Sequence, residues 1–303
     1  MKTRAVRQAR SPLYSLARIG LFALWIQCHA ASLFAQQPFF TDDAAVTAPG
    51  IVHFEFFNEI DGLQSSQYPN LRQNTANFKL NYGLPHDLEL DVDVPYISIS
   101  RAAGMKPSSS GPGDTDFGIK WNFRSSPDFQ RVALAATFYI EVPTGNVHDE
   151  LGSGVADYWL NFILQKPFTT RTRINTNLGF LFAGNTSTGA IGVQTTRGHV
   201  VTGGLCLLHD FNPRLTLGAE VYGGFADNDQ LGRRQLQGLA GGDYTLREGL
   251  DLTFGLIAGK YEASPRLGGQ IGFTVDLPTA MRKSSVKQSP LRSSLTSLKD
   301  GPR

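Results

Sequence analysis

The chain of 303 residues is long enough for one large all-β domain or two ordinary ones. Aromatic residues make up 11% of it and glycines number 32, and no core-type apolar run persists beyond the N-terminus. This composition fits a β-barrel better than a helical protein. The two cysteines, Cys28 and Cys206, are too few for a disulfide scaffold or a cysteine-based metal cluster.

The formal net charge of +2 hides an uneven distribution. Residues 1–35 carry five basic side chains and no acid, and residues 279–303 carry six basic side chains and one acid. The body of the chain, residues 36–278, therefore holds 17 basic and 25 acidic side chains. A body with net negative charge gives no reason to expect nucleic-acid binding.

The N-terminus, residues 1–35, has the features of a secretory signal peptide. Basic side chains precede an apolar run over residues 19–26, and small residues follow this run. The run is short for a membrane anchor helix, which is the alternative interpretation. We expect cleavage after Ala35, with Ala30 as the other candidate site, and we place residues 36–50 in the periplasm as an N-terminal segment.

Residues 51–277 form a series of stretches in which apolar and polar side chains alternate. In residues 87–94, for example, four aliphatic side chains alternate with four acidic ones. A period of two indicates a β-strand with one apolar and one polar face. Two of the stretches are weaker, because 198–209 is apolar on both faces and 234–244 is rich in glycine. The twelve expected strands are residues 51–60, 75–82, 87–94, 116–123, 131–141, 157–165, 173–182, 198–209, 215–222, 234–244, 250–256 and 270–277.

The connections between these strands alternate between short and long. Tight turns with Gly, Pro, Asn or Asp lie near residues 83–87 and 210–214, and longer loops near 61–74, 100–113 and 143–154. Short periplasmic turns, long outer loops and an even strand count are typical of outer-membrane barrels, which must close because lipid offers backbone groups no partner. The sequence therefore predicts an all-β fold, a transmembrane antiparallel up-and-down β-barrel of about 12 strands; a soluble barrel or sandwich is the alternative.

Several segments carry a resemblance to a known family. Residues 38–55 (PFFTDDAAVTAPGIVHFE), 111–123 (GPGDTDFGIKWNF) and 141–146 (EVPTGN), followed by 152–162 (GSGVADYWLNF), resemble outer-membrane proteins named for the MetA pathway of phenol degradation. The resemblance covers most of residues 38–277. It implies an outer-membrane barrel that is described as a transporter, and it implies no established substrate.

The two ends complete the domain organisation. Residues 278–303 are rich in Ser, Lys and Arg and show no apolar period, so we expect a disordered basic tail. Together with the signal peptide, the barrel pattern of residues 51–277 predicts secretion through the inner membrane and insertion into the outer membrane. Outer-membrane lipid is then an expected partner.

The polar faces of the expected strands would line the lumen, and they hold more acids than bases. The candidate lumen-facing residues are Glu55, Glu59, Lys79, Glu89, Asp91, Asp93, Asp116, Lys120, Glu141, Asp157, Arg173 and Glu220. A charged open lumen would bias ion passage, whereas an internal salt-bridge network would plug a narrow barrel, and both interpretations stay open. Glu89, Asp91 and Asp93 share one face, which suits either a divalent cation or opposing Lys and Arg side chains.

Enzyme signatures are missing from the sequence. It contains no G-x-S-x-G, no H-E-x-x-H and no phosphate-binding loop, and we expect no catalytic residues, no cofactor and no bound metal. The sequence predicts an outer-membrane pore or transporter for small solutes with a weak preference for cations. The alternative is a closed structural barrel whose outer loops bind partners. The pattern specifies neither a particular substrate nor an oligomeric state.

Overall fold

The computed structural model describes residues 37–125, 131–183, 198–226 and 235–279. The expected signal peptide and the expected tail from residue 280 onward lie outside the described residues. Within the described ranges, no helix is long and apolar enough to cross a membrane.

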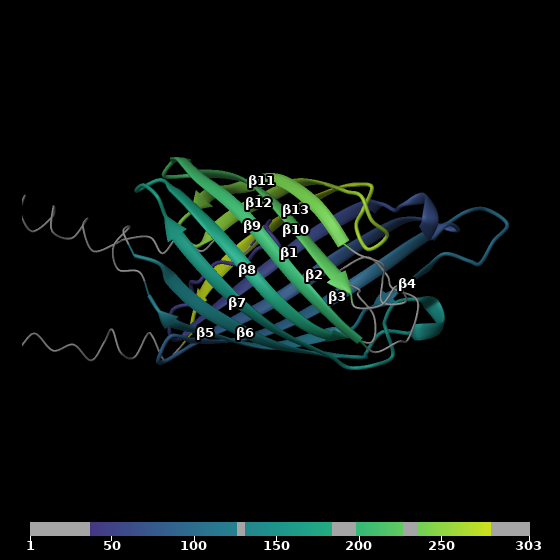
Figure 1. Ribbon diagram of the computed structural model, residues 1–303, viewed down its shortest axis with the longest axis horizontal. Helices are drawn as coiled ribbons and strands as arrows, with labels where there is room; N and C mark the ends of the chain where they lie inside the picture. The colour runs from purple at the N-terminus through teal and green to yellow at the C-terminus, as the bar shows by residue number, and fades with distance from the viewer. Residues whose placement is uncertain (1–36, 126–130, 184–197, 227–234, 280–303) are drawn as a thin grey trace, which may run out of the picture. The chain divides into compact units, whose positions relative to one another are not determined.

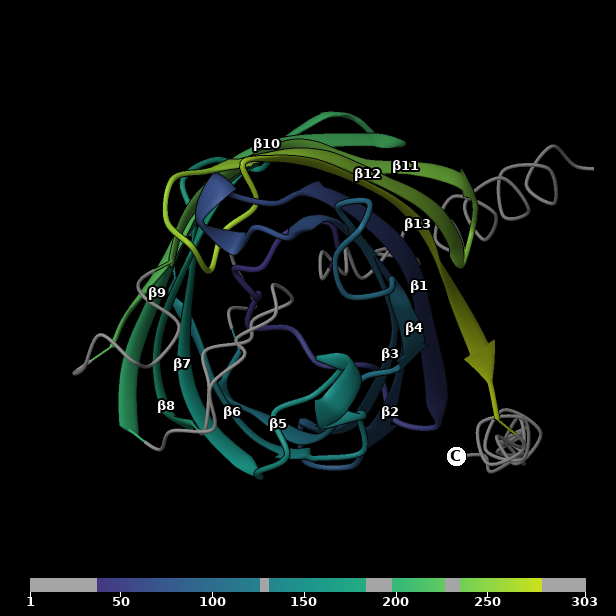
Figure 2. The ribbon, with the colours of Figure 1, turned by 90° about the vertical axis from the view of Figure 1, so that its right-hand side faces the viewer.

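The described strands form one antiparallel sheet that closes into a barrel (Figures 1 and 2). Consecutive long strands pair with each other, β1 also pairs with β13, and the β2–β3 pairing joins the two ends of the sheet. The strands are β1 (Ile51–Gly62), β2 (Asn70–Leu84), β3 (Leu88–Arg101), β4 (Ser109–Pro112), β5 (Thr115–Arg124), β6 (Ala133–Val142), β7 (Asp157–Pro167), β8 (Thr172–Ala183), β9 (Gly198–Asn212), β10 (Leu215–Ala226), β11 (Gln235–Arg247), β12 (Leu250–Gly259) and β13 (Leu267–Pro278), with two 3₁₀ turns, η1 (Ser65–Gln67) and η2 (Val147–Asp149).

The strands β4 and β5 share one place in the barrel wall. β5 pairs with residues 88–93 of β3, and β4 pairs with residues 96–99 of the same strand. Pro95, which has no backbone N–H to donate, lies where β3 changes its partner. The 13 described strands therefore occupy twelve positions around the barrel, which confirms the expected all-β barrel of about 12 antiparallel strands.

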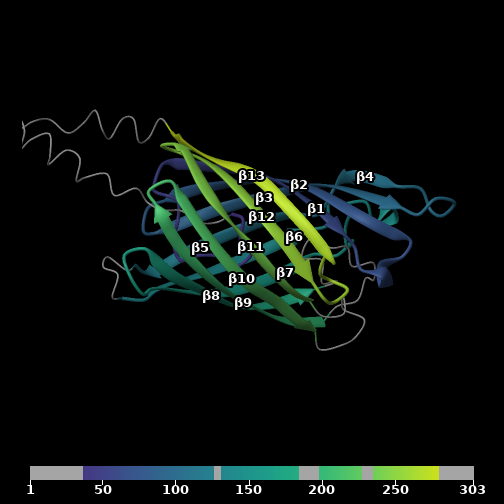
Figure 3. The ribbon, with the colours of Figure 1, turned by 90° about the horizontal axis from the view of Figure 1, so that it is seen from above.

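The short turns, the start of β1 and the end of β13 all lie at one end of the barrel. β1 begins opposite the last residue of β13, and the Thr279 backbone N–H donates to the Gly50 carbonyl at 2.9 Å. At the same end, short turns connect β2 to β3, β7 to β8, β9 to β10 and β11 to β12. In the first of these turns, His86 and Asp87 adopt φ angles of 67° and 58°. Longer connections lie at the other end, and the strands run tilted between the two ends (Figures 1 and 3).

Several strands extend further than the alternation predicts. β2 begins at Asn70, inside the segment 61–74 that we expected to be a loop, and β3 continues to Arg101. β4 lies within the expected loop 100–113, which is a second correction. Inside the barrel, where these extensions meet, Arg101 Nε donates to Asn70 Oδ1 at 2.7 Å, and both side chains are buried. The alternation ends there although the backbone pairing continues.

The barrel wall buries polar side chains and exposes apolar ones. On β5, Lys120 is fully buried, whereas its neighbours Ile119 and Trp121 are 40% and 52% exposed. On β2, Asn81 is fully buried and Leu80 is 48% exposed. This arrangement is the reverse of a soluble protein and matches a barrel with lipid outside and a polar interior. The outer face is therefore a transmembrane surface.

A charge on this outer face should destabilise the barrel according to its depth in the membrane. Phe162 lies in the middle of β7 and is 52% exposed, and Phe168 lies in the short turn that follows and is 55% exposed. We expect Phe162→Arg to lower the free energy of unfolding by about 2–4 kcal/mol and Phe168→Arg by about 0–1 kcal/mol. Denaturant unfolding in lipid vesicles measures both. Equal effects of the two substitutions would contradict a lipid-facing β7.

Candidate functional site: the barrel interior

The described residues that precede β1, from residue 37 onward, lie inside the barrel (Figure 2). We call residues 38–48 the inner segment. The backbone N–H groups of Phe40 and Thr41 donate to the two carboxylate oxygens of Glu220 on β10, at 2.9 and 2.8 Å. The expectation that residues 36–50 form a periplasmic segment did not foresee these contacts with the interior wall.

Charged side chains of β3 and β5 hold the inner segment from the other side of the lumen. The Lys120 ammonium lies 2.9 Å from an Asp42 carboxylate oxygen and 3.6 Å from one of Asp43, and the lysine side chain is 1% exposed. On β3, Glu89 accepts a hydrogen bond from the Thr47 backbone N–H. Because a buried charge is costly unless it is paired, these contacts position the segment and satisfy the wall at the same time.

An apolar contact completes the anchoring of the inner segment. Phe39 packs in a buried cluster with Cys206, Leu208, Leu239 and Ile257, which point inward from β9, β11 and β12. This contact explains why β9 is apolar on both faces, because one face meets lipid and the other receives the Phe39 ring. The fully buried Cys206 serves there as a small apolar side chain.

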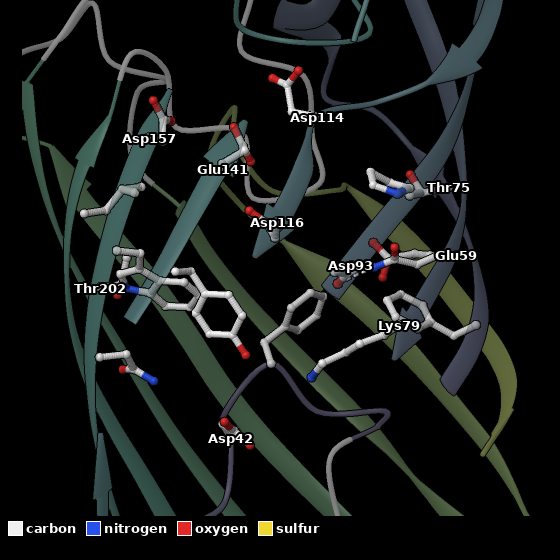
Figure 4. A pocket seen from close by; sticks show the side chains of 18 of the residues that line it. Asp42, Glu59, Thr75, Lys79, Asp93, Asp114, Asp116, Glu141, Asp157 and Thr202 are labelled. Carbon is white, nitrogen blue, oxygen red and sulfur yellow. Dashed lines mark hydrogen bonds between the residues drawn. The ribbon is translucent and has the colours of Figure 1, made fainter. Parts of the chain in front are cut away.

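A cavity of about 310 Å³ lies next to the inner segment (Figure 4). Phe40 and Asp42 of the segment line one part of it, and Leu151 and Gly152 of the β6–β7 loop line another. Among the described lining residues, Lys79 is the only basic one. The acidic residues that line the cavity are Asp42, Glu59, Asp93, Asp114, Asp116, Glu141 and Asp157.

The register of the sheet brings four of these acids into one row, which we call the acidic row. Asp93 on β3 lies opposite Asp116 on β5. Asp116 in turn lies opposite Glu141 on β6, and Glu141 lies opposite Asp157 on β7. Directly opposite side chains have Cβ atoms about 4.5–5.5 Å apart, and like charges at that spacing destabilise a sheet. Figure 4 shows Asp116, Glu141 and Asp157 on neighbouring strands, where they concentrate negative charge on one wall.

Lys79 on β2 belongs to a hydrogen-bonded network beside the acidic row, because the register places it opposite Asp93 of β3 and opposite Glu55 of β1. Its ammonium lies 3.8 Å from Glu55 Oε1, and the same carboxylate oxygen accepts a hydrogen bond from Asn81 at 2.8 Å. On the same strand as Lys79, Asn77 donates to Asp93 Oδ2 at 3.1 Å. One ammonium therefore faces several carboxylates, so the cavity keeps a clear excess of negative charge.

The twelve predicted lumen-facing residues divide into three groups. Those that line the cavity are Glu59, Lys79, Asp93, Asp116, Glu141 and Asp157. Those that contact the inner segment are Glu89, Lys120 and Glu220. The others, Glu55, Asp91 and Arg173, bond to wall side chains: Asp91 accepts from the Tyr139 hydroxyl at 2.8 Å, and Arg173 donates to Asp210 at 2.8 Å.

The shared strand face of Glu89, Asp91 and Asp93 does not bring these three acids to one ligand. Glu89 faces the inner segment, Asp91 binds Tyr139, and only Asp93 of the three lines the cavity. In the part of the chain that the structure describes, no group of three or more His, Cys, Asp or Glu side chains could hold a metal ion. The divalent-cation interpretation of this strand therefore has no support in the geometry.

The β6–β7 loop, residues 143–156, turns over the cavity and is held by Arg101 at the end of β3. Arg101 Nη2 donates to Glu150 Oε2 at 2.9 Å, and Nη1 donates to Ser109 Oγ at 3.0 Å. Leu151 of the same loop is buried against inward-facing isoleucines of β3. The loop is thus part of the wall of the cavity.

Comparisons with known proteins show the fold of outer-membrane channels. An outer-membrane channel from Pseudomonas putida F1 aligns with a TM-score of 0.62 at 16% identity, over 78% of this chain and 98% of that chain. The NanC porin aligns with a TM-score of 0.52 at 8% identity, over 74% of this chain and 100% of that chain. No family model and no curated protein matches the sequence. At these identities the likeness shows the barrel fold, and the family resemblance of the sequence stays a proposal.

Removal of the Lys120 charge should release the inner segment. Lys120→Met keeps the length of the side chain but removes the ammonium that Asp42 and Asp43 face, and breaking a buried ion pair costs about 3–5 kcal/mol. We expect the segment to become accessible to added protease while the barrel stays folded. Lys166→Met, which removes an exposed lysine of β7, is the matched control. Unchanged protease resistance of the segment in Lys120→Met would contradict its anchoring by this lysine.

The loop contact at Glu150 should weaken in acid. Partial burial raises the pKa of Glu150, but hydrogen bonds from Asn70, Arg101 and Lys106 outweigh it and hold this pKa below its ordinary value. A lowered pKa in the folded state means that the contact stabilises the loop above the ordinary glutamate pKa and is lost as the pH falls through the folded value. Cleavage of the loop by an acid-active protease should therefore increase over that range.

The substitution Glu150→Gln should remove this pH dependence, whereas Glu248→Gln, at an exposed short turn, should preserve it. Limited proteolysis across a pH series, followed by mass spectrometry of the fragments, measures the effect. If cleavage of the loop depended on pH in the same way in the unmodified protein and in Glu150→Gln, another group would control that dependence.

Proposed function

We propose that this chain is an outer-membrane pore for small solutes and that its interior weakly prefers cations. The observation that carries the proposal is the cavity inside a closed transmembrane barrel, lined by seven acids and one lysine. Like charges in a confined space raise the local concentration of counter-ions and repel co-ions, and acidic side chains are the recurring device of cation-preferring channels. The channel fold of the structural neighbours supports the same proposal.

The proposed location follows from the outer surface and the N-terminus. The apolar outer face would contact outer-membrane lipid, and residues 1–35 would direct secretion and be cleaved. The short-turn end, where β1 begins and β13 ends, would face the periplasm. The resemblance to the family named for the MetA pathway of phenol degradation is compatible with this location. It names no substrate for this chain.

A closed structural barrel with partner-binding outer loops is the second candidate function. The observation in its favour is the inner segment. Lys120, Glu89 and Glu220 of the barrel wall bind this segment and hold it inside the lumen. A segment so anchored narrows the path between the two ends of the barrel. The two candidates differ in conductance, since a closed barrel shows no current steps.

Planar-bilayer recording tests both the pore and its selectivity. We expect single-channel steps and, across a salt gradient, a reversal potential of cation-preferring sign. The double substitution Asp116→Asn with Glu141→Gln should move that potential towards zero, because it removes the centre of the acidic row. The preference should also weaken with salt, since the Debye length is about 10 Å at 0.1 M and shorter above it.

The matched control is Asp87→Asn with Glu248→Gln, which removes two exposed carboxylates at the short turns. It should leave the reversal potential near the value of the unmodified protein. Absence of current steps would favour the closed barrel. An anion-preferring pore would refute the assignment of selectivity to the acidic row.

A further inference from the structure

The inward faces of β6 and β7 form a ladder of three chemically distinct layers. Each layer is a directly opposite cross-strand pair, and all members line the cavity. Successive layers are two residues apart, or about 6.6 Å along a strand. From the long-loop end inward, the layers are acidic, aromatic and uncharged polar: Glu141 with Asp157, Tyr139 with Trp159, and Thr137 with Asn161.

Glycines on the flanking strands give the aromatic layer its position. A Cβ added to Gly118 of β5 would lie 2.2 Å from Cε1 of Tyr139, and one added to Gly179 of β8 would lie 2.4 Å from Nε1 of Trp159. Each ring therefore lies against the wall in space that only a glycine leaves open. The two ring centroids are 6.0 Å apart, with the planes at 34°. Together the rings form a platform on the cavity wall.

Beside the acidic layer, Asp116 of β5 lies opposite Glu141, and this pair has charge available for a ligand. Within the described residues, no other side chain makes a hydrogen bond or an ion pair with Asp116 or Glu141. These two carboxylates stand directly opposite each other, so their repulsion favours an added cation. The ammonium of Lys79 makes its ion pair with Glu55 of β1, at 3.8 Å, and not with either of these two carboxylates.

The polar layer at the other end holds buried atoms that lack partners. Thr137 is 1% exposed and Asn161 is 2% exposed, yet Thr137 Oγ1 and Asn161 Oδ1 have no hydrogen-bond partner among the described residues. Both side chains line the cavity. An unsatisfied buried polar atom costs about 1–3 kcal/mol, so each is a place where a ligand donor would be favourable.

We propose that this ladder is a binding site for arylalkylamines that carry a hydrogen-bond donor on the ring. The ammonium binds the Asp116–Glu141 pair, the ring stacks on Tyr139 and Trp159, and the ring donor reaches the polar layer. Cations also interact favourably with aromatic faces, so the first two layers act together. The proposal rests on the proposed pore function and names the solute class of that pore.

Three probes of similar size test the order of the layers. Tryptamine has the ammonium, the ring and the ring N–H; 1-methyltryptamine lacks the N–H; and indole-3-acetate replaces the ammonium with a carboxylate. Calorimetry on the purified, detergent-solubilised full chain should show tryptamine binding roughly fivefold more tightly than 1-methyltryptamine, the effect of one hydrogen bond. Indole-3-acetate should not bind.

Two variants assign the contacts. Asp116→Asn with Glu141→Gln should weaken both amines by at least about tenfold, because charged hydrogen bonds are lost. Thr137→Val, which keeps the shape of the side chain, should reduce the ratio between tryptamine and 1-methyltryptamine while it leaves the binding of 1-methyltryptamine unchanged. A purely structural role of Thr137 would not change that ratio. The heat-dependent gel shift of each variant verifies that its barrel is folded.

The outcomes separate this proposal from the pore proposal. Equal binding of tryptamine and indole-3-acetate, no tryptamine binding at all, or an unchanged ratio in Thr137→Val would overturn the ligand site. A barrel that conducts in planar bilayers but does not bind tryptamine would overturn the site and leave the pore standing. A barrel that binds tryptamine in the predicted order without conducting would support the site and refute the pore.

Discussion

A backbone that crosses lipid must find every hydrogen-bond partner within the protein, and this constraint governs the rest of the structure. The β2–β3 and β1–β13 pairings meet it by closing the sheet, so that the ladder has no lipid-exposed edge along these strands. Because the sheet is closed, one face of every strand points outward to lipid and the other points into the barrel. Apolar side chains then point to lipid, and polar and charged side chains are confined to an interior in which each needs a partner.

The interior meets that need with the chain itself. Backbone N–H groups of the inner segment satisfy Glu220 and Glu89, and its aspartates neutralise Lys120. These hydrogen-bond and charge partners are not distributed evenly through the lumen, however. Where the inner segment lies, it supplies donors and charges to the wall, whereas the cavity beside it is lined by the acidic row.

The strands could be predicted from the sequence because lipid imposes one alternating pattern along the whole wall. The pattern ends before the strands do, because β2 begins at Asn70 and β3 continues to Arg101, where the two buried side chains form a hydrogen bond with each other. The inner segment could not be predicted in the same way, since Phe40 meets Glu220 across 180 residues of sequence and no local period marks such a contact. The one trace of it in the sequence was β9, which is apolar on both faces because its inner face receives Phe39.

The place of the inner segment also constrains the order in which the barrel assembles. Its partners come from β3, β5, β10 and β13, where Gln270 donates to the Pro38 carbonyl, so its contacts are complete only when strands from the whole chain are present. It is joined directly to β1, whose seam with β13 is the last to become available as the chain emerges from N- to C-terminus. The contacts of the inner segment and the β1–β13 seam are therefore completed by the same late event, the arrival of the last strand.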